Sequence, residues 1–217
     1  LTEGAFNPAL LPLQLAAGDD RSLVDARTTL LPVDASASAR VTDIVFHDDG
    51  RVGFPRGLSV DAGGIAKGRA ADLVVAWARA NGADGVCVNI GGDMAIDTGD
   101  ETGWNVDVLS PVTGGTATTV RVSRGGVATS AVGARHRNGG GIASHIFTVD
   151  GAAPVDGVVG ATVIASTGAW AEAWTKACIV SDTTSALESL GSHGLAGMIV
   201  SADGSVRTTD SWSSFTP

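Results

Sequence analysis

The amino-acid sequence predicts an α+β fold in which 217 residues form one domain. Several short stretches alternate apolar and polar side chains, which is the pattern of half-buried strands, and a few others repeat apolar residues at helical spacing. The strand-like stretches outnumber the helical ones, and the chain carries no internal repeat and no convincing linker. The prediction is therefore a single unit, residues 1–217, of mixed strands and helices.

The first 40 residues carry the weakest pattern. Three prolines interrupt short apolar pieces there, and the run DASASAR at 34–40 is typical of a loop. Residues 41–55, VTDIVFHDDGRVGFP, place apolar residues at every second position on both sides of Asp49 and Gly50. This pattern predicts a β-hairpin.

Residues 61–72 read DAGGIAKGRAAD and lead into the first predicted helix. Apolar residues then recur at helical spacing as far as Trp77, and the pair Asn81 and Gly82 is a good stop signal. Lys67 therefore lies at or near the N-terminus of this helix.

The rest of the chain is predicted to contain strands, two helices and a closing hairpin. The strands fall within 85–96, 103–111 and 118–130, with two more within 144–166; the helices are at 169–180 and 184–194, and the hairpin is at 196–210. The glycines form separate clusters without a period, which indicates tight turns and close backbone approach.

Composition and charge exclude several classes of protein. A chain with 44% hydrophobic and 17% charged residues is ordinary for a soluble globular protein. A net charge of −9 and a pI near 4.7 argue against a protein that coats nucleic acid, although they leave room for the phosphates of a small ligand. Cys87 and Cys178 lie in apolar runs without CxxC spacing, so we expect buried free thiols, which do not fix the redox compartment.

The sequence carries no sign of a membrane span or a leader. No apolar stretch reaches the roughly 20 residues that a span requires. Residues 1–16 lack the basic region and the long apolar core of a signal peptide. We therefore expect a soluble chain, either cytoplasmic or extracytoplasmic, since a leader that has been removed leaves no trace.

The glycine and lysine pattern at 61–68 predicts an anion site. A helix N-terminus offers unpaired N–H groups and a partial positive charge, so Lys67 beside glycines suits a phosphate or pyrophosphate. The stretch is not a P-loop, because Lys67 precedes Gly68 and no Ser or Thr follows, and G-x-G-x-x-G is absent. A glycine-rich turn with a solvated lysine is the alternative.

Five motifs extend this hypothesis. In chain order they are DAGGIAKGRAAD, VCVNIGGDMAI, GWNVDVLSP, GGVATSA and SHI. With this order and these gaps the chain resembles the ApbE family of FAD:protein FMN transferases over most of its length. The resemblance implies an enzyme that binds FAD and cleaves its pyrophosphate with the help of Mg²⁺. It would transfer FMN to a threonine of an acceptor flavoprotein and release AMP.

The resemblance also assigns roles to matched positions. Lys67 corresponds to the family's lysine at the flavin nucleotide, and Gly63 and Gly64 supply backbone beside the pyrophosphate and the metal. The other matched positions are Asp61 and Asp72 around that motif, Asn89, Gly91, Gly92 and Asp93 in N-x-GGD, Thr129 and Ser130 in the TS turn, and His145 in HI. A strand-end cap for Asp61 and a structural carboxylate for Asp72 are the alternatives.

Two residues depart from the family's metal site. Many members carry an Asp and, one turn later, a Thr as Mg²⁺ ligands, where this chain has Glu172 and Lys176. Glu172 can still bind Mg²⁺ through oxygen, together with Gly64, but the ammonium of Lys176 has no lone pair to offer. We therefore expect Lys176 to pair with Glu172 near the ligand's phosphates or in the metal's place, and Mg²⁺ to bind weakly or not at all. An ordinary helical salt bridge is the alternative.

Two further departures concern activity. After His145 the family usually continues with Asp-Pro, a basic residue and Thr-Gly-Pro, of which this chain keeps only Gly151 and Pro154. The family's N-terminal segment, with its Met-Gly-Thr type motif, is missing. We expect little transferase activity from this chain alone, with His145, Glu172 and Lys176 as candidate catalytic residues and His145 or Glu172 as candidate base.

The alternatives to a transferase are a flavin-binding homologue without activity and a hydrolase of the FAD pyrophosphate. A further stretch, DGVVGATV at 156–163, is close to the acceptor motif Asp-Gly-x-Ser/Thr-Gly-Ala-Thr, with Thr162 at the modified position. Val159 stands where that motif has Ser or Thr, and GATVIAS is a good β-strand, so the strand is the favoured interpretation.

Overall fold

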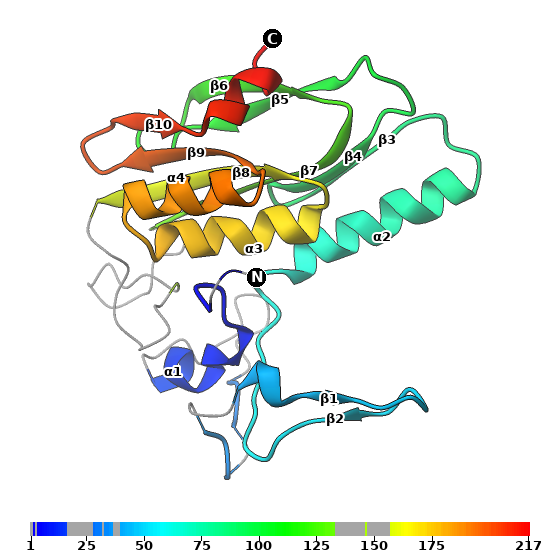
Figure 1. Ribbon diagram of the computed structural model, residues 1–217, viewed down its shortest axis with the longest axis vertical. Coiled ribbons are helices and arrows are strands. Elements are labelled where there is room, and N and C mark those ends of the chain that lie inside the picture. The colour runs from blue at the N-terminus through cyan, green and yellow to red at the C-terminus, as the bar shows by residue number, and fades with distance from the viewer. Residues whose placement is uncertain are drawn as a thin grey trace.

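The computed structural model describes residues 2, 4–16, 28–31, 33–36, 40–132, 146 and 157–217. An antiparallel six-stranded sheet forms its centre, in the order β10-β9-β8-β7-β4-β3 (Figure 1). The strands are β3 (Val86–Ile90), β4 (Asp93–Asp97), β7 (Arg124–Ala131), β8 (Val158–Ala165), β9 (Ala196–Ser201) and β10 (Val206–Thr208). The predicted α+β class is confirmed.

Three helices cover one face of this sheet (Figure 1). They are α2 (Ala66–Ala80), α3 (Gly168–Ile179) and α4 (Thr183–Ser192). Helix α3 is apolar on most of its circumference and lies against β7 and β8, so its residues Ala171, Trp174 and Ile179 are buried in the main core. Helix α2 packs Ala71 and Val75 against β3 and β4. The helix predicted from Ala66 to the Asn81–Gly82 stop is confirmed.

A second layer covers the other face. The hairpin of β5 (Trp104–Leu109) and β6 (Thr116–Val122) packs there, together with the 3-10 helix η3 (Asp210–Phe215) (Figure 1). Valines at alternate positions of the hairpin meet Ile96, Ile164 and Trp212. Period-two alternation therefore points these valines into a core, as the sequence predicts.

The N-terminal elements are small. The 3-10 helix η1 (Pro8–Leu10) continues into α1 (Leu11–Ala16), which the sequence pattern did not predict, and η2 (Val41–Asp43) precedes the hairpin of β1 (Val45–Phe46) and β2 (Val52–Gly53). This hairpin was predicted, and it projects from the body of the molecule (Figure 1). Of the two strands predicted within 144–166, β8 is present, and residues 144, 145 and 147–156 lie outside the described residues.

The prediction that both cysteines are buried is wrong for Cys87. Cys87 is exposed on β3, the edge strand of the sheet, because its neighbours Val86 and Val88 turn toward α2. Cys178 is buried on α3, and burial raises the pKa of its thiol to about 12. Within the described ranges, the helices are too short or too polar to cross a membrane.

Candidate functional site

The site lies where the first turns of α2 and α3 cross. Gly68 and Gly168 meet there so closely that a Cβ on Gly68 would lie 2.2 Å from the carbonyl oxygen of Gly168. Gly126 of β7 is beneath the same point, since its Cβ would lie 2.3 Å from the Gly168 backbone. Only glycine fits at such a contact, because even a methyl group would overlap the neighbouring backbone.

Each helix start is capped by a carboxylate from the other helix. Glu172 Oε2 accepts a hydrogen bond of 2.8 Å from the backbone N–H of Gly68. In return, Asp72 accepts hydrogen bonds from Gly168 N at 2.7 Å and Ala169 N at 3.0 Å. A carboxylate at a helix N-terminus satisfies backbone donors and interacts favourably with the helix dipole. The structural alternative for Asp72 therefore agrees with its contacts.

Glu172 carries two further partners, both of them lysines. Its Oε1 lies 3.3 Å from Lys176 Nζ and 3.5 Å from Lys67 Nζ. Lys67 also forms a salt bridge with Asp93 at the start of β4. The predicted pairing of Glu172 with Lys176 is confirmed. We call these four residues, Lys67, Asp93, Glu172 and Lys176, the charge cluster.

The charge cluster is layered. The side chains of Asp93 and Glu172 are 1% and 0% exposed, whereas those of Lys67 and Lys176 are 37% and 15% exposed. The two carboxylates therefore lie beneath and the two ammonium groups lie toward solvent. Buried charges require such pairing, because the transfer of an unpaired ion from water costs several kcal/mol even after relaxation.

The turn between β3 and β4 positions Asp93. Gly91 and Gly92 have φ angles of 61° and 95°, which side chains rarely adopt, and Asn89 Oδ1 accepts a 2.8 Å hydrogen bond from Gly92 N. Ile90 pairs directly with Asp93, so the two glycines form a tight hairpin turn. Asp93 Oδ1 is buried and receives no hydrogen bond from the described residues. N-x-GGD is thus a turn that delivers one carboxylate to Lys67.

The turn before α2 is held by local contacts. Asp61 Oδ1 accepts a 2.8 Å hydrogen bond from Gly63 N, and Asp61 N donates to Pro8 O at 2.8 Å. A Cβ on Gly64 would lie 2.7 Å from the ring of Phe6, so a larger residue here requires the Phe6 ring to move, which gives this glycine a packing role. The roles of Asp61, Gly63 and Gly64 toward a nucleotide remain predictions.

The TS turn attaches α3 to the sheet. Ser130 Oγ lies 2.7 Å from Thr175 Oγ1, which itself donates to the carbonyl oxygen of Glu172 at 2.7 Å. Because a hydroxyl has one proton, Ser130 is the donor in the first bond. Thr129 Oγ1 lies 3.0 Å from Thr162 Oγ1 of the neighbouring strand. Thr162 is buried within β8, which agrees with the strand interpretation of residues 156–163.

The described residues do not fit a divalent cation at Glu172. Both of its oxygens are engaged, one by the Gly68 N–H and the other by two ammonium groups. In the described ranges, no group of three or more His, Cys, Asp or Glu side chains could hold a metal ion. The metal roles predicted for Glu172 and Gly64 therefore gain no support. His145 lies outside the described residues.

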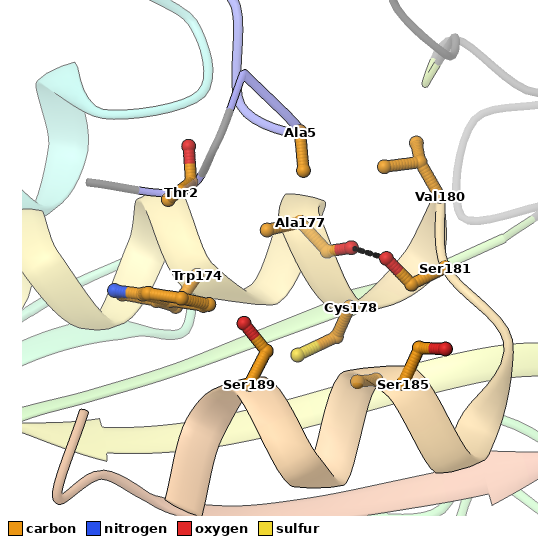
Figure 2. Close-up of a pocket in the computed structure, with 10 residues that line it drawn as sticks. Thr2, Ala5, Trp174, Ala177, Cys178, Val180, Ser181, Ser185 and Ser189 are labelled. Atoms are coloured by element: carbon orange, nitrogen blue, oxygen red, sulfur yellow. Dashed lines mark hydrogen bonds between the residues drawn. The ribbon is translucent and has the colours of Figure 1, made fainter. Parts of the chain in front are cut away.

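A cavity of about 360 Å³ lies on the other side of α3 (Figure 2). Trp174 and Cys178 face it from α3 and Ser181 from the turn that follows, and α4 and the segment around Thr2 and Ala5 complete its walls. Ser181 Oγ is already bonded to the carbonyl oxygen of Ala177 at 2.9 Å. The cavity is separate from the charge cluster, because helical geometry points Glu172 and Lys176 away from it.

One family profile and several solved structures are similar to this chain. The ApbE family profile matches residues 1–200. The crystal structure of an ApbE protein from Thermotoga maritima is 24% identical with a TM-score of 0.83, covering 100% of this chain and 73% of that one. No curated protein matches the chain in sequence.

Two further solved structures have a lower TM-score. The flavin transferase ApbE from Vibrio cholerae is 21% identical with a TM-score of 0.76, covering 99% of this chain and 72% of that one. The flavinyl transferase ApbE from Pseudomonas stutzeri, in its apo form, has the same identity and TM-score, with 98% and 69% covered. At these identities the likeness concerns the fold.

Proposed function

This chain belongs to the ApbE family, and we propose that it is a flavin transferase that takes FMN from FAD, attaches it to a threonine of an acceptor flavoprotein and releases AMP. The flavin transferases of Vibrio cholerae and Pseudomonas stutzeri share its fold and support the general activity. The choice of FAD, the threonine acceptor and the release of AMP belong to the proposal.

The charge cluster is the observation that carries this proposal. Three motifs that are far apart in the sequence contribute to it, namely the glycine and lysine turn, N-x-GGD and helix α3. Together they place two ammonium groups at one partly exposed point beside the N-terminus of α2. Positive charge at a helix start is suited to the pyrophosphate of a dinucleotide.

In the proposed reaction the acceptor's threonine oxygen attacks the phosphorus on the FMN side of the pyrophosphate. A new P–O bond forms, the bond from this phosphorus to the bridging oxygen breaks, and AMP leaves with that oxygen. Lys67 and Lys176 offset the negative charge that grows on the leaving phosphate. Catalysis of this kind depends mainly on positioning and on charge placed in advance.

The threonine proton passes to a base. Of the two candidates, Glu172 has both oxygens engaged and is fully buried, so it is better placed to hold the lysines than to take a proton. His145 remains the other candidate from the sequence. The sequence after His145 differs from the family's usual one, so we expect a slow reaction.

The test is to incubate the purified chain with FAD and an acceptor domain that carries the Asp-Gly-x-Ser/Thr-Gly-Ala-Thr motif. Intact-mass measurement should show FMN on the acceptor threonine and AMP in solution, and an acceptor with that threonine changed to valine is the control. Free FMN with AMP would replace the proposal with a hydrolase. Intact bound FAD would replace it with a flavin-binding protein.

A further inference from the structure

The chain contains only two lysines, and both lie on the same carboxylate. The other twelve basic residues of the 217 are arginines, and Lys67 and Lys176 are the two positions where lysine stands. They come from different helices, more than 100 residues apart, yet both ammonium groups lie within 3.5 Å of Glu172 Oε1. A chain that uses arginine everywhere else therefore brings both of its lysines to one point.

From this we infer that Lys67 and Lys176 hold the diphosphate of the flavin dinucleotide directly, so that its binding requires no divalent cation. The inference rests on the proposed function, since it names what the same site does with its substrate. It concerns how the negative charge of the ligand is balanced.

The layering of the charge cluster supports this inference. An anion that approaches from solvent meets the two partly exposed ammonium groups first, because the two carboxylates beneath them are 1% and 0% exposed. The carboxylates fix both ammonium groups in place before a ligand arrives. The chain as a whole carries a charge of −9 and the four charges of the cluster sum to zero, so the partly exposed ammonium groups are the part of the cluster that attracts an anion.

The same geometry argues against a cation bound beside Glu172. Mg²⁺ requires near-ideal octahedral coordination by oxygen. At Glu172 Oε1 it would have to displace two ammonium groups or lie within a few ångströms of both. Two like charges at such a distance repel strongly where water is excluded. Among the described carboxylate oxygens of the cluster, only Asp93 Oδ1 lacks a hydrogen-bond partner.

Lysine rather than arginine suits this role. An ammonium group is a compact point charge with three donors, so it can contact a carboxylate and a phosphate oxygen together in a narrow space. A guanidinium group is planar and wider, and it favours two parallel bonds to one partner. A compact ammonium group therefore suits the place of a bound Mg²⁺ better than a guanidinium group does.

The first experiment measures binding by titration calorimetry in EDTA and in excess MgCl₂. The probes are FAD, inorganic pyrophosphate and riboflavin, which has no phosphate. We expect the Kd for FAD to agree within about twofold between the two buffers, as no ion takes part. A fall of tenfold or more in FAD affinity on removal of Mg²⁺ would overturn the inference and leave the proposed function standing.

The second experiment changes one charge. Lys176→Met should weaken FAD and pyrophosphate about tenfold to a hundredfold in EDTA, since it removes a charge-assisted contact, and should leave riboflavin unchanged. Arg51→Met is the matched control, because Arg51 is an exposed cation that pairs with Asp49 on the distant β1–β2 hairpin. Equal losses in both variants, or no loss in either, would count against the inference.

The third experiment keeps the wild-type chain and therefore does not depend on the folding of a variant. Reductive methylation modifies amines, and its only side-chain targets here are Lys67 and Lys176. FAD in EDTA should slow the methylation of both several-fold, as peptide mass spectrometry would show. Unchanged methylation in the presence of saturating FAD would overturn the inference. Protection by pyrophosphate without any FAD binding would overturn both the inference and the proposed function, because the site would then hold a diphosphate but not the flavin dinucleotide.

Discussion

Asp72 and Glu172 occupy equivalent positions in the two helices that cross at the site, yet their surroundings differ. Each lies one turn after the glycine that starts the crossing, in GRAAD on α2 and GAWAE on α3, and each accepts the N–H of the other helix's glycine. Asp72 is half-buried, and backbone N–H groups are its partners. Glu172 is fully buried and also holds Lys67 and Lys176.

The difference shows how a candidate site can be recognised when the same carboxylate cap occurs at two places in a fold. The cap itself explains why an acidic residue stands at both positions, so acidity alone indicates nothing about chemistry. The additional lysines at Glu172 exceed what a cap requires. It is therefore the second set of partners that distinguishes Glu172, on which the proposed function depends, from Asp72.

The largest expected effect comes from the contact between Gly68 and Gly168, on which the caps formed by Asp72 and Glu172 both depend. Gly68→Ala places a Cβ 2.2 Å from the backbone of Gly168, so the helices must move apart and both caps must lengthen. We expect the free energy of unfolding to fall by about 3 kcal/mol, the upper part of the range for overpacking, and Tm to fall by roughly 6–12 °C.

Gly191→Ala is the matched control, measured by the same thermal and urea unfolding. Gly191 also lies in a helix, but a Cβ there would meet nothing within 4 Å. Stability should be unchanged or raised by up to about 1 kcal/mol. A similar loss in both variants would show that the close crossing is not what makes Gly68 necessary.

A pair of isosteric changes sharpens the comparison. Asp72→Asn leaves one backbone donor facing an amide group and should cost about 1 kcal/mol, as for loss of a cap. Glu172→Gln leaves two ammonium groups around a neutral side chain and should cost about 3 kcal/mol, as for a broken buried ion pair. Urea unfolding gives both values.

Inorganic pyrophosphate distinguishes the two variants further. It should restore part of the Tm lost in Glu172→Gln, because an anion can take the place of the missing charge, and none of that lost in Asp72→Asn. Equal costs for the two changes, or equal rescue, would mean that the two carboxylates have one role.

The smallest effect concerns a third carboxylate cap, Asp182 at the start of α4, whose partners are all local. The side-chain hydroxyl of Ser185 and the backbone N–H groups of Ser185 and Thr184 lower its pKa below the ordinary 3.8. A lowered pKa in the folded state stabilises the fold above pH 3.8, and this contribution is lost as pH falls through the lower, folded-state value.

Urea unfolding of the wild type and of Asp182→Ala at a series of pH values checks this. The difference in free energy of unfolding between them should be largest at neutral pH and should decrease below pH 3.8, the ordinary pKa of the group. A difference that is constant down to acid denaturation would show that the charge of this cap contributes nothing.

Much of the local structure was predictable from the sequence, and the crossing was not. The helix after DAGGIAKGRAAD, the turn at N-x-GGD and the pairing of Glu172 with Lys176 depend on neighbours in sequence, so periodicity and spacing reveal them. The contact of Gly68 with Gly168 and the salt bridge of Lys67 with Asp93 depend on tertiary packing. No local pattern encodes such contacts.

One signal for the site was nonetheless available in the sequence. The presence of just two lysines among fourteen basic residues marks Lys67 and Lys176 as a pair before any fold is known. For Cys87, in contrast, an apolar run indicated burial, whereas an edge strand leaves one of its faces open. The sequence pattern shows which residues of a strand share a face, but it does not show which face other elements of the fold will cover.

The crossing can form only late in the synthesis of the protein, because its two helices are far apart in the sequence. The Gly68 amide and the Glu172 carboxylate that caps it are 104 residues apart, so the ribosome produces α2 and the turn of Lys67 long before α3 exists. During that interval Lys67 has Asp93 as a partner but no second ammonium group beside it. A nascent chain therefore lacks the paired cations, and the charge cluster is complete only after α3 has been translated.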